Sequence, residues 1–145
     1  ARAETVAVKP SFRGAFLHRR VLIPASGFYE WRKEEKSRQP YFIHLKGGQP
    51  FAFGGLYENG LMKEQLPESC AIITTAANSL VAPIHQRMPL IIPRELYQPW
   101  LDPGTPPEQL QMMLKPYPAE EMEAYPVSRL VNNPAFDHPD CLKKV

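Results

Sequence analysis

The chain has 145 residues, of which 43% are hydrophobic and 22% are charged, as in a globular domain with a buried core. It has no apolar run near the ~18 residues of a membrane span. The opening ARAETVAVKP lacks the layout of a signal peptide, so we expect a cytoplasmic protein. The 17 prolines, about twice the usual ~5% share, predict short helices and strands.

Charge is uneven along the chain. Residues 1–46 carry ten Lys or Arg against four Asp or Glu, whereas residues 47–145 carry seven against eleven. A basic face on a chain of net charge +2 would suit a polyanion such as nucleic acid. Chance clustering on a solvated surface is the alternative.

The first elements follow from hydrophobic spacing. Residues 11–20 predict a short amphipathic helix with Ser11 as its N-cap. Residues 21–24, VLIP, predict a strand that ends in the turn ASG. In the next strand, 28–33, alternation places Phe28 and Glu30 on one face and Trp31 on the other.

The middle of the chain contains β-branched and turn-forming segments. After a charged loop at 34–40, the Gly-Gly pair predicts a hairpin between the strands around it. One or two helical turns should follow the strand at 70–75 and stop near Pro83. The expected strands are 41–46, 49–58, 70–75 and 88–93.

Two helices are predicted near the C-terminal end. One begins at Pro93 and runs to 101, and the clearest one covers 105–115. There Thr105 is the expected N-cap and Glu108 completes a capping box. A strand at 125–131 and a turn-rich tail at 132–140 complete the prediction, which is a single α+β domain over residues 1–145, made mostly of short strands. The adjacent Met112 and Met113 are interpreted as core residues.

The sequence offers no cofactor motif. Cys70 and Cys141 lie in no CxxC or His/Cys ligand spacing, so we predict neither a disulfide nor a metal site. No GxGxxG, P-loop, GxSxG or HExxH motif is present, and we therefore expect no nucleotide cofactor.

Glu30 and His85 are the candidate catalytic pair. Glu30 lies among aromatic residues in GFYEW, where an unpaired carboxylate is costly and its pKa is expected to rise. His85 lies where a short helical segment meets a strand, a common place for catalytic groups. Together they could act as an acid and a base. His18, His44 and His138 are interpreted as surface or structural histidines.

Several blocks, taken in order, resemble the SOS-response-associated peptidase (SRAP) family over nearly the whole chain. The blocks are ARAETV at 1–6, RRVLIPASGFYEW at 19–31, FAFGGLYE at 51–58, IITTAANSLVAPIHQRMPLIIP at 72–93 and AYPVSRLVNNP at 124–134. GFYEW and the HxRMP pattern are specific together.

The resemblance implies a barrel-like fold of short coiled strands and a role at abasic sites in single-stranded DNA. In the family, an N-terminal cysteine attacks the open-chain sugar aldehyde and forms a thiazolidine crosslink. The family's active-site glutamate and histidine match Glu30 and His85. Its phosphate-contacting arginines match Arg2 and Arg87, and a pocket-lining threonine matches Thr74. Such a protein would be a monomer, bound to the nucleoid when it engages DNA.

The matched blocks begin inside the family's conserved core. The family's nucleophilic cysteine lies upstream of the position of Ala1, and an active-site asparagine directly precedes it. We therefore expect residues 1–145 to be the larger, C-terminal part of an SRAP domain and to form no crosslink alone. Cys70 and Cys141 cannot replace the nucleophile, because thiazolidine formation needs an α-amine and a thiol on one residue.

Two other functions stay open at this point. An autoproteolytic cysteine peptidase would use Glu30 and His85 to release a leader. A non-catalytic single-strand binder would use aromatic and basic residues to stack bases and hold phosphates.

Overall fold

The computed structural model describes residues 1–59 and 68–145. Within these ranges the chain forms short helices and mostly short strands, so the predicted α+β class is confirmed. The strands are β1 (Arg20–Ala25), β2 (Phe28–Lys33), β3 (Arg38–Leu45), β4 (Phe51–Glu58), β5 (Ser69–Ile72), β6 (Thr74–Ala76), β7 (Arg87–Pro89), β8 (Ile91–Ile92) and β9 (Met122–Pro126). The α-helices are α1 (Pro10–His18), α2 (Tyr97–Leu101) and α3 (Pro107–Met112). Single 3-10 turns are η1 (Lys46–Gly48), η2 (Arg94–Leu96), η3 (Ala119–Glu121), η4 (Arg129–Asn132) and η5 (Pro139–Leu142).

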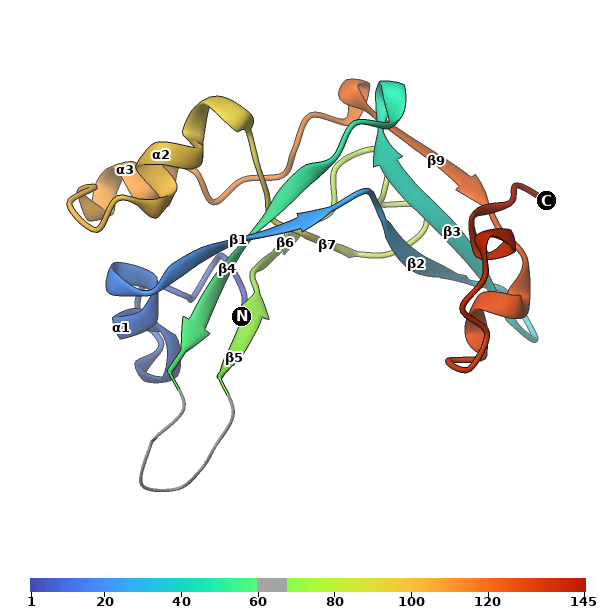
Figure 1. Ribbon diagram of the computed structural model, residues 1–145, viewed down its shortest axis with the longest axis horizontal. Helices are drawn as coiled ribbons and strands as arrows, with labels where there is room; N and C mark the ends of the chain where they lie inside the picture. The colour runs from blue at the N-terminus through green and yellow to red at the C-terminus, as the bar shows by residue number, and fades with distance from the viewer. Residues whose placement is uncertain (60–67) are drawn as a thin grey trace.

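The described strands fall into three sheets. One has the order β1-β4-β5 with β8 also paired to β4, the second is β2-β3-β9, and β6 pairs with β7. The helices gather at one end of the molecule, the β2-β3-β9 sheet and the C-terminal segment lie at the other, and the N-terminus lies between them (Figure 1). The pairing within residues 1–59 and 68–145 closes no barrel, so the barrel-like arrangement remains a prediction.

Strand β4 is the central strand of the first sheet, where it pairs with β1, β5 and β8. Its residues from Phe51 to Leu56 are all buried. It joins two hydrophobic clusters. The cluster at the helical end includes Phe16, Leu56 and Trp100. The cluster beside β2-β3-β9 includes Phe53 and the residues Ile43, Val81, Met88 and Met122. Both faces of β4 therefore meet apolar side chains, as in a buried central strand.

A buried arginine joins the helices to this centre. Arg20, at the start of β1, is 7% exposed. Its guanidinium donates hydrogen bonds of 2.6 to 2.7 Å to the carbonyls of Phe16, Leu17, Trp100 and Asp102. These carbonyls lie at the C-terminal ends of α1 and α2, where helices leave acceptors unpaired and favour a cation.

The predicted hairpin across Gly47 and Gly48 is wrong. Both glycines have positive φ, 82° and 69°, so they do reverse the chain. However, β3 pairs with β2 and β9, whereas β4 pairs with β1, β5 and β8. A glycine pair specifies a turn, but the burial of β4 on both faces decides its partners.

Other local predictions need smaller corrections. Lys9 rather than Ser11 precedes α1, and Pro106 rather than Thr105 precedes α3, with no side-chain cap in either case. The Thr105 hydroxyl instead donates to the Pro99 carbonyl at 2.6 Å. The segments 70–75 and 88–93 each form two strands, interrupted at Ile73 and Leu90. The last strand ends at Pro126, and η4 occupies most of the segment predicted to continue it.

The remaining elements largely match the predictions from the sequence. The helix that begins after Pro93 is divided into η2 and α2, and 79–84 form successive turns. Met113 is buried, but Met112 is 74% exposed, so only one of the two is a core residue. In the part of the chain that the structure describes, every helix is too short or too polar to span a membrane.

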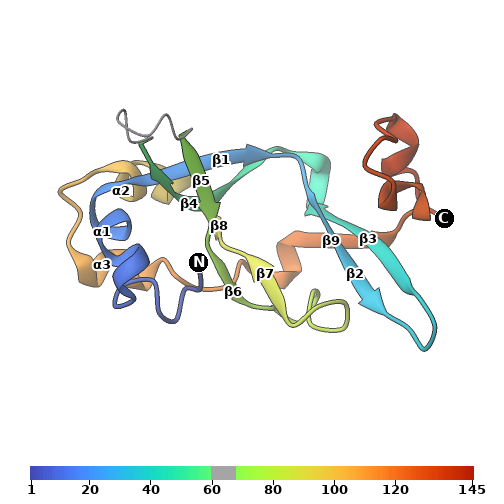
Figure 2. The same cartoon turned by 90° about the horizontal axis from the view of Figure 1, so that it is seen from below.

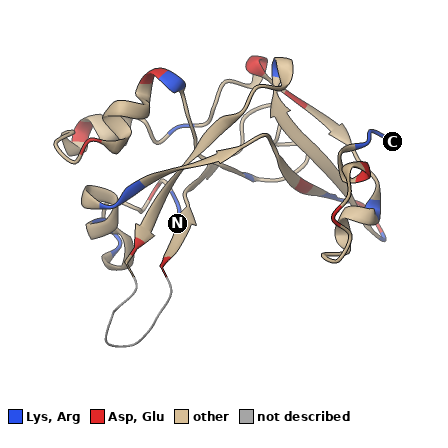
Figure 3. Ribbon diagram, in the orientation of Figure 1, with Lys and Arg blue, Asp and Glu red and all other residues tan. Residues whose placement is uncertain are grey.

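The cations of residues 1–46 lie at both ends of the molecule (Figure 3). Figure 3 shows basic residues at the α1–β1 end and again at the far end of β2 and β3. Arg20 is buried, Arg19 pairs with Glu58, and Arg32 pairs with Glu34. The charge imbalance of the sequence is therefore divided between two ends of the molecule, and three of its cations are buried or paired.

Candidate active site

Strand β2 presents Glu30 on its inner face. Register pairs Glu30 with Tyr41 of β3, and Phe28 on the same face contacts the cluster beside β2-β3-β9. Trp31 lies on the opposite face, as the alternation predicts, and its indole N–H donates to Asn132 at 2.7 Å. Gly27 permits this entry into β2, since a Cβ there would lie 2.8 Å from the Ile43 carbonyl oxygen.

A capped turn positions His85. The Asn78 side-chain oxygen accepts hydrogen bonds from the N–H groups of Leu80 and Val81 at 3.1 and 3.0 Å. Its amide nitrogen donates to the Tyr117 carbonyl at 2.7 Å. The turn then ends in a bond from the His85 N–H to the Val81 carbonyl at 2.9 Å. Asn78 therefore fixes both the start of the turn and its attachment to the rest of the domain.

Glu30 and His85 meet at the surface. The carboxylate oxygen Oε2 lies 3.8 Å from His85 Nδ1, and the two side chains are 22% and 42% exposed. Partial burial raises the pKa of Glu30, and the nearby His85 and a hydrogen bond from the Trp31 backbone N–H oppose that rise. A carboxyl group whose charged form is disfavoured can serve as a general acid nearer neutral pH.

The His85 ring is held through its Nδ1 atom. The backbone N–H of Arg87 donates to Nδ1 at 3.1 Å, and the Arg87 carbonyl oxygen lies 3.0 Å from the same atom. In the neutral ring that accepts from Arg87, the proton is on Nε2. When Nδ1 also carries a proton, it can donate to the carbonyl or to Glu30. The Arg87 backbone can therefore hold Nδ1 in either role, through its N–H when Nδ1 accepts and through its carbonyl oxygen when Nδ1 donates.

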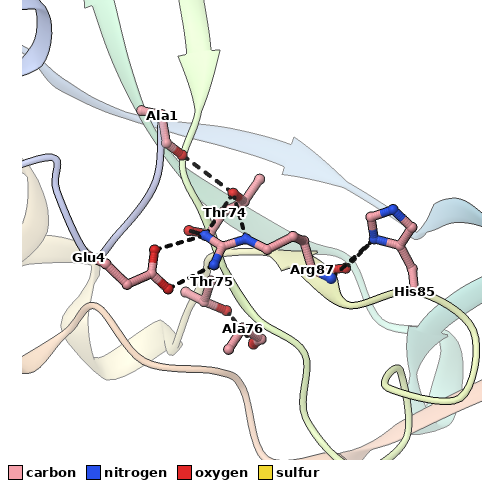
Figure 4. Close-up of polar contacts among 7 residues, drawn as sticks. All are labelled: Ala1, Glu4, Thr74, Thr75, Ala76, His85 and Arg87. Carbon is pink, nitrogen blue, oxygen red and sulfur yellow. Dashed lines mark hydrogen bonds and ion pairs between the residues drawn. The ribbon is translucent and has the colours of Figure 1, made fainter.

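The Arg87 guanidinium lies between Thr74 and Glu4 (Figure 4). Nη2 donates to the Thr74 carbonyl at 2.6 Å and to its hydroxyl at 3.1 Å. Nη1 and Nη2 donate to the two carboxylate oxygens of Glu4 at 2.8 and 3.0 Å. This two-bond geometry is a strong form of arginine–carboxylate pairing. It also lowers the pKa of Glu4, mainly through the Arg87 hydrogen bond.

Arg2 reaches the same region through its backbone. A parallel bridge joins Arg2 to Thr74, and the Ala3 N–H donates to the Thr74 carbonyl at 2.9 Å. Its side chain is exposed, and no ion pair of Arg2 occurs within residues 1–59 and 68–145. Figure 2 shows β6 and β7 between this N-terminal segment and β2.

The predicted residues Arg2, Thr74, Arg87, His85 and Glu30 therefore form one continuous series of neighbours. Sequence reasoning missed Glu4 and Asn78. Glu4 stands in the matched ARAETV block, and Asn78 precedes the turn that leads to His85, so both had a local signal. In the described part of the chain, no three His, Cys, Asp or Glu side chains gather as metal ligands would.

Residues 1–134 match the model of the family described as SOS response associated peptidase (SRAP). The chain belongs to this family. It is 47% identical over 146 residues to the abasic site processing protein YoqW of Bacillus subtilis. This match covers 99% of the chain and 65% of YoqW. It is 32% identical to the abasic site processing protein HMCES of Gallus gallus, covering 97% of this chain and 48% of HMCES.

The fold also matches that of a solved structure. A crystal structure of a protein from Bacteroides thetaiotaomicron superposes with a TM-score of 0.92 at 34% identity. The match covers all of this chain, 100%, and 65% of the other. This chain thus spans just under two thirds of that structure and of YoqW.

Proposed function

We propose that the full-length protein senses abasic sites in single-stranded DNA during the DNA damage response and processes them covalently. The observation that carries this proposal is the contact between Glu30 and His85, at 3.8 Å, beside the arginine and threonine neighbours described above. The names of the SRAP relatives, abasic site processing proteins, point to the same substrate.

In this proposal Glu30 and His85 handle protons at the sugar. An abasic deoxyribose must open from its ring to an aldehyde before an amine can attack it. Glu30, with its raised pKa, gives a proton to the ring oxygen, and His85 accepts the proton of the 1-hydroxyl group. Arg2 and Arg87 contact backbone phosphates, and Thr74 lines the pocket.

The covalent step follows the family's chemistry. The α-amine of an N-terminal cysteine adds to the aldehyde, and water leaves as an imine forms. The thiol then adds across the C=N bond, sulfur to carbon and its proton to nitrogen, which closes a thiazolidine. Cys70 and Cys141 are internal and have no α-amine, so neither is the nucleophile. We expect the protein to act as a monomer in the cytoplasm, on the nucleoid when bound to DNA, and its strands to form a barrel-like SRAP fold.

The test is a crosslinking reaction between the full-length protein and a single-stranded oligonucleotide that carries one abasic site. A heat-stable adduct on a denaturing gel is expected with the abasic strand and not with an intact strand. Glu30→Gln should slow adduct formation by about 100-fold, the usual loss of an acid–base group. Glu34→Gln, just beyond the same strand, is the control. Equal rates for Glu30→Gln and wild type would exclude the acid–base role, and equal binding without any adduct would favour a non-catalytic single-strand binder.

A second function is favoured by the description of the family as a peptidase. Here Glu30 and His85 would assist attack of the N-terminal cysteine on the peptide bond that joins it to a leader. Expression of the leader-bearing protein with Glu30→Gln distinguishes the cases by mass spectrometry. A retained leader supports autoproteolysis, whereas normal removal of the leader argues against it.

A further inference from the structure

The two arginines expected to contact phosphates are in different electrostatic states. Arg2 is exposed and makes no ion pair within residues 1–59 and 68–145. Arg87 is already bound by a carboxylate at two points, with Nη1 and Nη2 each donating to an oxygen of Glu4. A phosphate would therefore find Arg2 available and Arg87 occupied.

Glu4 covers the outward side of the Arg87 guanidinium. The side chain of Arg87 is 19% exposed, and that of Glu4 is 52% exposed. The remaining bonds of the guanidinium run to the carbonyl and hydroxyl of Thr74. Figure 4 shows Glu4 and Thr74 on different sides of it. The Glu4 carboxylate thus uses the pair of donors that a phosphate would use, because arginine binds both anions in the same forked geometry.

The contact can be exchanged at modest cost. The pairing has two bonds, but about half of the Glu4 side chain lies in solvent, so its carboxylate regains water when it leaves Arg87. The loop that carries Glu4 is held independently, through hydrogen bonds from the Thr5 and Val6 N–H groups to the Arg2 carbonyl and through the buried Val6 side chain. Glu4 can therefore leave Arg87 without loss of the loop.

We propose that Glu4 is an internal anion that competes with DNA phosphate for Arg87 and so weakens the binding of any single strand. The inference rests on the proposed function. With Glu4 in place, Arg87 adds little to the affinity for any single strand, so intact DNA is held weakly. Retention of an abasic strand then depends on chemistry at the sugar rather than on charge alone.

The test measures equilibrium binding of the full-length protein to an intact single strand and to one carrying a tetrahydrofuran abasic analogue, which has no aldehyde. Fluorescence anisotropy is recorded over a salt series. Glu4→Gln should tighten binding to both strands by up to about five-fold, the change in affinity expected when phosphate no longer has to displace one ion pair with an exposed carboxylate. It should also steepen the dependence of log K on log salt by about 0.7, the contribution of one additional phosphate contact on a single strand.

Two further variants separate competition from a general charge effect. Glu58→Gln removes a comparable carboxylate, 57% exposed and 2.7 Å from Arg19, and should leave binding unchanged. In an Arg87→Gln background, most of the gain from Glu4→Gln should disappear. Unchanged or weaker binding by Glu4→Gln, or a gain that persists without Arg87, would overturn the proposal. Wild-type protein that forms no adduct with an abasic strand would instead refute the proposed function itself.

Discussion

The helical end and the candidate active site each contain an arginine whose donors are occupied, but by different groups. At the helical end, Arg20 is buried, and its hydrogen bonds within residues 1–59 and 68–145 all run to backbone carbonyls. At the active site, Arg87 donates to a carbonyl and a hydroxyl on one side and to an exposed carboxylate on the other.

The difference separates a structural role from a functional one. The carbonyls around Arg20 belong to the backbone of α1, α2 and the residue after α2, so they cannot move away without unfolding that end. The Glu4 carboxylate is on a side chain in contact with water, and another anion can replace it. A guanidinium bound by backbone stabilises a fold, whereas one bound by an exposed side chain can exchange partners.

The largest expected effect is at Arg20. Arg20→Met should lower the free energy of unfolding by about 3 kcal/mol, because it leaves the buried carbonyls of two helix ends without donors. Urea denaturation followed by circular dichroism measures the change. Arg19→Met, which removes the exposed pair with Glu58 and an exposed bond to the Tyr57 carbonyl, should cost less than about 1 kcal/mol. A similar loss for both variants would contradict a structural role specific to Arg20.

A smaller effect is expected at the turn that carries His85. Asn78→Ala removes the cap of the Leu80 and Val81 N–H groups and should cost about 1 kcal/mol. It should also slow adduct formation in the crosslinking gel, since His85 is no longer held at the end of a fixed turn. Asn133→Ala, which removes an exposed bond to the Ala135 N–H, provides the comparison and should not alter the rate. An unaffected rate in Asn78→Ala would show that His85 is positioned by Arg87 alone.

The smallest expected effect is a pH-dependent change in stability at Glu30. Because burial raises its pKa in the folded state above the ordinary 4.5, the folded protein binds this proton more tightly than the unfolded chain. The contribution is therefore favourable at low pH and is lost as pH rises through the folded pKa. Glu30→Gln should raise Tm at pH 7, with the difference disappearing below pH 4.5. A constant difference in Tm across this range would show that ionisation of Glu30 is not the cause.

Local sequence patterns predicted an element correctly where its own residues specify it. Alternation in FYEWRK matches β2 residue for residue, and the faces of Glu30 and Trp31 follow from it. The family motifs selected residues that lie side by side. Patterns failed where a choice depends on distant partners. Gly47 and Gly48 turn the chain as expected, but the strands on either side of them enter different sheets.

The sequence by itself determined the class of the fold, the family, most of the elements and a set of candidate site residues without Glu4 and Asn78, because periodicity and motifs are properties of neighbouring residues. Only the tertiary structure decided which ionic groups meet. Glu4 and Arg87 are far apart in the sequence, and they come together because Arg2 bridges to β6 and β6 pairs with β7. Charge counts located the basic residues but not their partners, since pairing and burial depend on how strands are ordered in space.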